Sequence, residues 1–201
     1  MSVVEFGAGY STSVIAHALE INERELSEWA SANRRVENPF TVLSVDQSDF
    51  WLQETIKRTS PALRKFIRPH ESRVSMGTFQ DKACTYFEDL PNTVADLVFL
   101  DGPDQYAPAN TVRGFSTAAP SLMPMAADLL VVEHFFEPGA VIIVDGRAAN
   151  ARFLRKNFQR SWRYQYFKEE DFHAFELDED PLGKINAKRV SRLRPILSPL
   201  R

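Results

Sequence analysis

Short apolar runs alternate along the chain with longer segments that have the periodicity of amphipathic helices. The apolar runs predict strands over residues 3–6, 41–45, 73–76, 96–100 and 140–144. The periodic segments predict helices over residues 13–32, 48–59, 126–136 and 148–159. Residues 84–87 fit either a further strand or part of a helix, and the proline-interrupted segment 108–124 is expected to cross a face of the sheet. Alternating strands and helices indicate an α/β fold with a doubly wound parallel sheet covered on both faces.

The C-terminal part of the chain has a different pattern. Residues 163–167 and 172–177 alternate around the acidic segment 169–171, which predicts two antiparallel strands joined by a polar turn. With the five earlier strands, this hairpin would complete a mostly parallel seven-stranded sheet. The strand at 96–100 is nearly all apolar and is expected in the middle of the sheet.

The first strand leads into a glycine turn and then into the first helix. Gly7 and Gly9 permit a positive φ and a close approach of a ligand to the backbone, and Ser11 and Thr12 suit a helix start. The N–H groups of such a start attract an anionic group. The helix is expected to bury an apolar stripe formed by Val14, Ile15, Ala18, Leu19, Leu26 and Trp29.

Acidic side chains stand at or near the ends of four predicted parallel strands. They are Glu5, Asp46, Asp101 and Asp145. Ligands of open α/β sheets bind beyond the carboxyl ends of the strands, where the strand order reverses. These acids and the glycine turn are therefore expected to face one crevice. An ionised carboxylate only accepts hydrogen bonds, so Asp46 suits a vicinal diol.

Composition narrows the class of protein and of partner. The length of 201 residues fits one domain. With a net charge of −3 and a pI near 5.8, the chain lacks the overall positive charge that favours binding to nucleic acid. A single cysteine, Cys84, excludes an intrachain disulfide and favours a reducing, cytoplasmic location. The sequence has neither an 18-residue apolar run nor the pattern of a signal peptide, so no membrane association is expected. Homo-oligomerisation is left open.

The last residues carry a segregated positive charge. We expect a domain over residues 1–180 and a basic tail over residues 181–201. The tail would either contact an anionic partner or dock on the acidic segment 169–180, and the second reading is favoured. Its basic residues are Lys184, Lys188, Arg189, Arg192, Arg194 and Arg201.

Residues 2–178 resemble the class I S-adenosylmethionine-dependent methyltransferases. The resemblance depends on Glu5-Phe6-Gly7-Ala8-Gly9-Tyr10-Ser11, on Asp46, on Leu100-Asp101-Gly102-Pro103 and on the closing hairpin. It implies that S-adenosylmethionine is the cofactor and that a methyl group is moved to an oxygen or nitrogen of a small molecule. It also implies a cofactor site made by Glu5, Gly7, Ala8, Gly9, Tyr10, Ser11, Asp46, Gln47 and Asp101.

The resemblance assigns roles within that site. The glycine turn would hold the amino-acid end of the cofactor and Asp46 the ribose, while Asp101 would line the reaction centre as the catalytic residue. Tyr10 and Tyr106 are placed to shape the pocket. Family members usually carry helical segments before the first strand, whereas this sequence starts almost inside that strand, so incomplete cover over the cofactor is expected.

Two other functions remain open. A nicotinamide-dependent oxidoreductase is disfavoured, because Thr12 stands where the third glycine of Gly-x-Gly-x-x-Gly belongs and Asp46 lies too far along the chain. A non-catalytic binding protein on the same fold is the third reading. Asp101 and Asp145 could pair around a metal as in the catechol-type O-methyltransferases, but Gly146 follows the second acid where that group has Asn. No metal site is therefore predicted.

Overall fold

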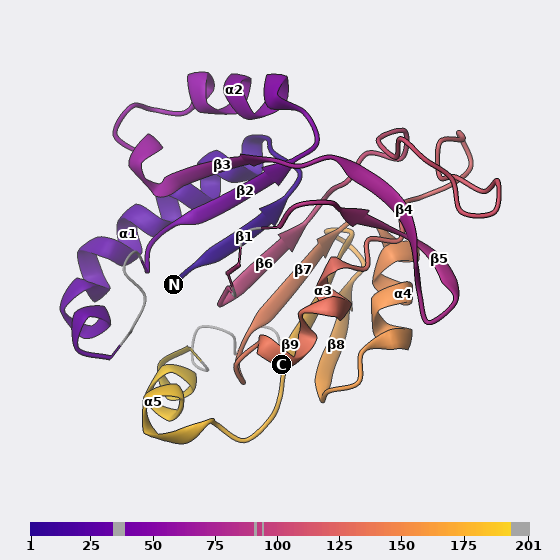
Figure 1. Cartoon of the computed structure of the whole chain (residues 1–201). Coiled ribbons are helices and arrows are strands. Elements are labelled where there is room, and N and C mark those ends of the chain that lie inside the picture. The colour runs from indigo at the N-terminus through magenta and orange to yellow at the C-terminus, as the bar shows by residue number, and fades with distance from the viewer. Residues whose placement is uncertain (34–38, 91, 94, 194–201) are drawn as a thin grey trace.

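The chain folds around one seven-stranded sheet in the order β3-β2-β1-β6-β7-β9-β8, as seen in a computed structural model (Figure 1). The structure describes residues 1–33, 39–90, 92–93 and 95–193. The strands of this sheet are β1 (Val3–Phe6), β2 (Val42–Asp46), β3 (Ile67–Glu71), β6 (Leu97–Leu100), β7 (Val141–Asp145), β8 (Trp162–Phe167) and β9 (Phe172–Leu177). The first five run parallel, whereas β9 is antiparallel to both β7 and β8. The expected α/β sheet with a C-terminal antiparallel hairpin is confirmed.

Helices cover both faces of the sheet (Figure 1). They are α1 (Tyr10–Asn33), α2 (Asp49–Arg58), α3 (Asp128–Val131), α4 (Ala148–Asn157) and α5 (Gly183–Leu193), with 3-10 turns η1 (Arg64–Phe66) and η2 (Glu133–Phe135). Leu19 of α1 packs in a cluster with Val3 and Val42. Leu154 of α4 packs in the other cluster, together with Phe6. Successive strand residues thus serve opposite faces, as the pleat requires.

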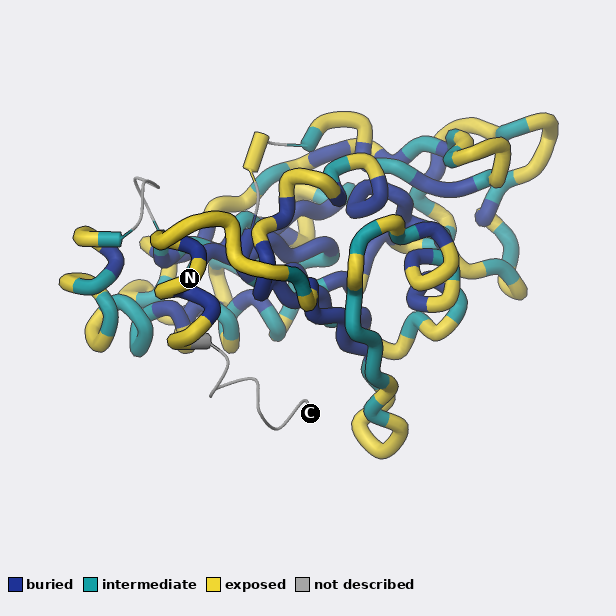
Figure 2. Tube along the Cα trace, turned by 90° about the horizontal axis from the view of Figure 1, so that it is seen from below, coloured by how far each residue is buried: buried dark blue, intermediate teal, exposed yellow. Residues whose placement is uncertain are grey.

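The buried residues follow the central strands (Figure 2). β6 lies between β1 and β7, and Val98 and Leu100 are each 1% exposed. Ile142 and Val144 of the neighbouring β7 are also inaccessible to solvent. Strands covered on both sides have to be apolar throughout, which is why this part of the sequence predicted a central strand correctly.

The third strand of the sheet is not where the sequence predicts it. Of the predicted residues 73–76, the last three belong to β4 (Val74–Phe79), which pairs with β5 (Lys82–Phe87) in a separate two-stranded sheet. β3 lies at an edge of the main sheet, and only Ile67 of its residues is buried. Such a strand needs no apolar run, and an edge tolerates Pro69. The alternatives at 84–87 are resolved in favour of a strand.

Helix α1 begins earlier than expected and buries another face. It starts at Tyr10, and its buried residues are Thr12, Ala16, Leu19 and Ala30. Val14 is 69% exposed and Ala18 is exposed, so the predicted stripe is wrong at these positions. The buried face is set by the polar contact of Thr12 with β1 and by small residues that let the helix approach the sheet.

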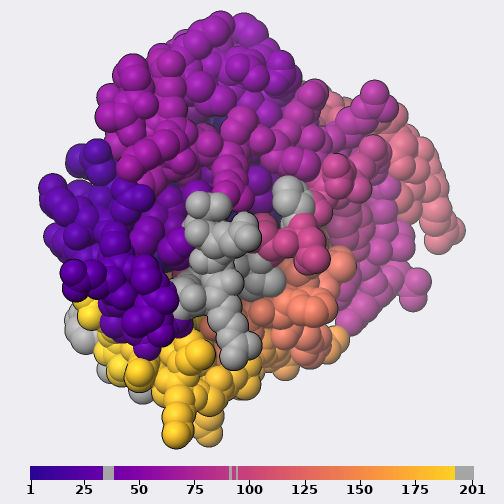
Figure 3. All heavy atoms as spheres, turned by 60° about the vertical axis from the view of Figure 1, so that its left-hand side comes forward, coloured from indigo at the N-terminus to yellow at the C-terminus, as the bar shows by residue number. Residues whose placement is uncertain are grey.

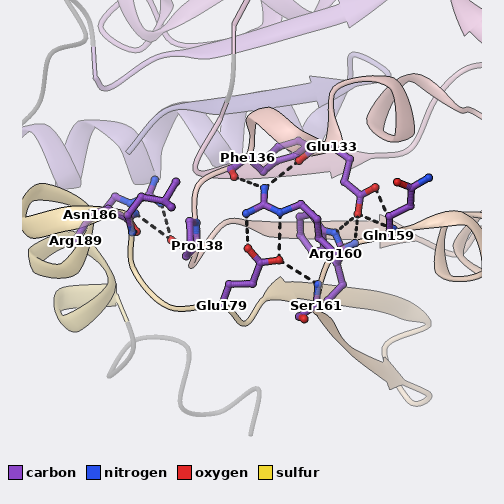
Figure 4. Close-up of polar contacts among 11 residues, drawn as sticks. Glu133, Phe136, Pro138, Gln159, Arg160, Ser161, Glu179, Asn186 and Arg189 are labelled. Carbon is purple, nitrogen blue, oxygen red and sulfur yellow. Dashed lines mark hydrogen bonds and ion pairs between the residues drawn. The ribbon is translucent and has the colours of Figure 1, made fainter.

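The helix expected over residues 126–136 is two short pieces, α3 and η2. Backbone bonds from Thr85 N to the Met125 carbonyl and from Ala127 N to the Thr85 carbonyl tie the start of the segment to β5. Further along, the buried Glu133 carboxylate accepts from the amides of Gln159 and Arg160 (Figure 4). Because residues 125–127 bond to β5, helix α3 begins only at Asp128.

The basic C-terminal segment forms α5, which lies beside α1 at the surface (Figure 3). Its Arg189 side chain is buried and pairs with Asp96. Asn186 donates to the Pro138 carbonyl, and Lys188 to Asn33. The helix therefore docks on the base of β6 and on the segment before β7 rather than on residues 169–180; Arg194 and Arg201 lie outside the described residues.

Within the described part of the chain, none of the helices combines the length and apolarity needed to cross a membrane.

Candidate functional site

Two loops meet at the carboxyl ends of β1 and β6. Gly7 has a φ of 99°, and a Cβ built on it would lie 3.0 Å from the Gly102 nitrogen. A Cβ on Gly102 would lie 2.9 Å from the Gly7 nitrogen. The Asp101 amide donates to the Phe6 carbonyl and completes the contact. Both positions therefore need glycine, because the two backbones pass each other without room for a side chain.

Asp46 fastens the glycine turn to the end of β2. One carboxylate oxygen accepts from the Ala8 amide and the other from the Ser48 amide, both at 2.8 Å. The residue is only 5% exposed, and this burial raises the pKa of the Asp46 carboxyl, against the lowering effect of the backbone donors. Asp46 thus lies at the predicted place, but its oxygens are engaged by the protein backbone.

Glu5 supports the same turn from beneath. Its carboxylate accepts from the Thr12 hydroxyl at 2.5 Å and from the Ser44 hydroxyl at 2.9 Å, and the residue is inaccessible to solvent. The Thr12 oxygen in turn accepts from the Gly9 amide at 3.1 Å. Burial raises the pKa of the Glu5 carboxyl. Glu5 is therefore a supporting residue of the loop, where the resemblance implied contact with a ligand.

The outer surface of the turn is open. A Cβ on Gly9 would meet no atom within 4 Å, and Tyr10 is 83% exposed. Ser11 and, at the end of β2, Gln47 are half-buried. The N–H end of the long helix α1 points out of this surface, which suits an anionic group. Gly9, Tyr10, Ser11 and Gln47 are thus the predicted residues that a bound molecule could contact.

Asp101, at the end of β6, pairs with an arginine that the sequence did not lead us to expect. Arg147 Nε is 3.4 Å from Asp101 Oδ1, and another guanidinium nitrogen of Arg147 donates to the Pro103 carbonyl at 2.8 Å. The Asp101 side chain is 49% exposed, compared with 16% for Arg147. Arg147 follows Asp145 and Gly146, so a cation just after an acidic strand end was the available signal.

The neighbouring strand end carries Asp145, which is exposed. Partial burial raises the pKa of the Asp145 carboxyl, the charges of Asp101 and Asp171 raise it further, and Arg147 lowers it. Of the four acids expected to face one crevice, Asp101 and Asp145 are thus close enough to influence each other electrostatically. Among the described residues, no group of three or more His, Cys, Asp or Glu side chains is arranged to hold a metal ion.

Two further polar side chains, His173 of β9 and Tyr106, differ in exposure. His173 is 4% exposed, accepts or donates one hydrogen bond with the Tyr164 hydroxyl, and stacks on Tyr166 at 4.4 Å between ring centroids. It is part of the hairpin packing. Tyr106 is 55% exposed on the loop after Pro103, and its expected role in shaping a pocket stays a prediction.

Models of protein families and the curated proteins were both compared with this chain, and neither comparison returned a match. The function therefore has to be argued from the fold and from the site.

Proposed function

We propose that the protein is an S-adenosylmethionine-dependent methyltransferase that acts on an oxygen or nitrogen of a small molecule. The observation that carries the proposal is the insertion of antiparallel β9 between β7 and β8, next to a parallel sheet whose first strand ends in the Gly7 turn. The closing antiparallel hairpin is a feature of the class I methyltransferases. The dinucleotide-binding sheet has the order 3-2-1-4-5-6.

Thr12 argues against the nicotinamide alternative. In the dinucleotide fingerprint a glycine at this place allows close packing of the helix on the strand. Here Thr12 is inaccessible to solvent, and its hydroxyl connects Glu5 to the Gly9 amide. The turn is therefore held by side-chain hydrogen bonds in place of the third glycine.

The residues of the turn fit the amino-acid end of the proposed cofactor. The Gly9 surface and the start of α1 would receive its carboxylate, and Asp46 would hold the Ala8 peptide in position. Because Asp46 is only 5% exposed and each of its oxygens already accepts a backbone bond, the half-buried Gln47 is the better candidate to bind the ribose hydroxyls. When bound, the cofactor would supply an electrophilic methyl group, with S-adenosylhomocysteine as the leaving group.

Asp101 is the residue proposed to take the proton of the acceptor. Its carboxylate is half-exposed at the end of β6, and Arg147 fixes one of its oxygens. Proton removal by a positioned carboxylate makes an oxygen or nitrogen a better nucleophile. The remaining task of the site is to align the acceptor and to exclude water.

The proposal is tested by calorimetric titration of the protein with S-adenosylmethionine, S-adenosylhomocysteine and NADH. We expect binding of the first two and none of NADH. Gly9→Leu should abolish this binding without loss of stability, because its side chain projects into open space over the turn. Ala18→Leu, at an exposed position of the following helix α1, is the matched control and should bind normally. Binding of NADH alone would refute the proposal.

A further inference from the structure

A pocket of about 320 Å³ lies between the β4–β5 hairpin, the segment 115–125 and the start of α4. This volume is within the range of small-molecule sites. Phe115 and Met123, which are 46% and 40% exposed, mark its outer part, and the buried Met76, Cys84 and Thr117 form its inner part. The lining residues are Met76, Ala83, Cys84, Phe115, Thr117, Ser121, Leu122, Met123, Met125 and Ala149.

The lining is uncharged and rich in sulfur. The chain contains 4 methionines, and all except Met1 line this pocket. None of the lining residues is an acid, a lysine or an arginine. Burial raises the pKa of the Cys84 thiol, so this group also stays neutral at physiological pH. Thioethers are polarisable, adapt their shape and make favourable contacts with aromatic rings.

Few polar groups of the pocket are left to bind a ligand. The Thr117 hydroxyl is already engaged, since it donates to the Gln105 carbonyl at 2.9 Å. Ser121 is exposed. A charged molecule would therefore lose its hydration in this pocket without a compensating partner.

Two segments that line the pocket are also connected to Asp101 or to the loop that follows it. Ala149 lies two residues after Arg147, whose guanidinium contacts both Asp101 and the Pro103 carbonyl. The bond from Thr117 to Gln105 ties the other wall of the pocket to the loop that follows Pro103. Figure 1 shows the segment from 104 to 125 beyond the carboxyl ends of β6 and β7, beside β4.

We propose that this pocket is the acceptor site and that it binds an uncharged aromatic molecule whose hydroxyl or amine points toward Asp101. This inference rests on the proposed function. The ring lies against the three thioethers and Phe115, and the polar group lies at the Ala149 end of the pocket, on the side of Arg147 and Asp101. The pocket thereby narrows the acceptor from any small molecule to a neutral aromatic alcohol or amine.

The test uses protein labelled with ¹³C at the methionine methyl groups, titrated at neutral pH with 2-naphthol. We expect the signals of Met76, Met123 and Met125 to shift, while that of Met1, which packs against the other core cluster, stays in place. Naphthalene-2-carboxylate, an anion of similar shape, should bind about tenfold or more weakly. Neither measurement requires a substitution.

Two variants locate the binding. Ala149→Phe fills the pocket and should weaken 2-naphthol binding about tenfold or more. Ala148→Phe places the same ring at the adjacent exposed position, outside the pocket, and should leave the affinity unchanged. Equal effects of the two variants, unshifted methionine signals or equal binding of the anion would overturn the inference.

Titration of the same samples with S-adenosylhomocysteine separates this inference from the proposed function. If S-adenosylhomocysteine binds and 2-naphthol does not, the acceptor assignment fails and the proposed function stands. If 2-naphthol binds and S-adenosylhomocysteine does not, the proposed function fails, and with it the role of the pocket as an acceptor site.

Discussion

The buried surroundings of Asp128 change the acidity of its carboxyl. It is 4% exposed at the start of α3, and one of its oxygens accepts from the Phe87 amide at 3.0 Å. Burial raises the pKa of its carboxyl to about 7, against the lowering effect of that amide bond. The folded protein therefore keeps a proton on Asp128 at pH values where the unfolded chain has lost it.

This difference predicts how stability changes with pH. The stabilising proton is fully present below the ordinary carboxyl pKa and is lost as the pH rises through about 7. Between pH 5 and pH 8 the wild type should lose about 2–3 kcal/mol relative to Asp128→Asn, which keeps an acceptor for the Phe87 amide but does not titrate. Urea unfolding of both proteins at the two pH values measures the difference. Parallel stability profiles would contradict the assignment.

At this scale the sequence located the loop residues but not their partners. Glu5 and Asp46 were expected at strand ends because acids interrupt apolar runs there. Their hydrogen bonds to Thr12 and to the Ala8 amide depend on how two strands and a helix pack together. Arg147 was not predicted as a site residue for the same reason, since its contact with Asp101 joins two segments that are 46 residues apart.

Among the elements, the start of the C-terminal hairpin is held by a buried carboxylate, in addition to the pairing of β9 with β7. Glu133 is 2% exposed and accepts from the amides of Gln159 and Arg160 and from the Trp162 indole at 2.9 Å. The Arg160 guanidinium returns a bond to the Glu133 carbonyl and pairs with Glu179 (Figure 4). The entry into β8 is thus fixed from both sides.

Glu133→Gln should destabilise the protein by about 2–3 kcal/mol, because an amide replaces one accepting oxygen with a donor that faces other donors. In this variant the increase in amide hydrogen exchange should be largest in β8. Glu169→Gln, in the exposed turn of the hairpin, is the control and should change the unfolding free energy by less than about 0.5 kcal/mol. Equal stability of the two variants would show that Glu133 does not anchor the hairpin.

The sequence predicted helices and strands correctly where all residues on one face of the element have the same surroundings. The central strands are apolar because both faces are buried. The hairpin strands alternate in polarity, which is the pattern of a strand with two different faces. β3 failed because an edge strand has little to bury, and the segment 126–136 failed because its first residues bond to β5. Both errors come from contacts between segments that are remote in sequence, which a local pattern does not contain.

For the molecule as a whole, α5 closes the end of the sheet opposite to the candidate site. Arg189 and Asp96 are 6% and 4% exposed and form an ion pair beneath the helix. The guanidinium also donates to the Pro138 carbonyl at 2.8 Å, and the Ser2 amide donates to Asp96 at 2.8 Å. The basic segment is thereby joined to the domain that precedes it.

Arg189→Leu should lower the free energy of unfolding by about 3–5 kcal/mol, because it leaves the Asp96 carboxylate buried without its cation. Arg192→Leu is the matched control on the same helix. That residue is exposed over the Trp29 ring at 5.5 Å, and its loss should cost about 1 kcal/mol or less. Chemical denaturation measures both variants. A small effect of Arg189→Leu would mean that α5 contributes little to the stability of the fold.

The contact of Gly7 with Gly102 also sets a rule for the evolution of the chain. A side chain at either position would collide with the backbone of the other loop, so substitution at one site is not relieved by a change at the second. Sequences that have diverged too far for whole-chain comparison should still keep one glycine after β1 and another after β6. In this chain the second glycine is followed by Pro103. A search for this spaced pair, filtered for the closing hairpin, offers a way to find distant relatives.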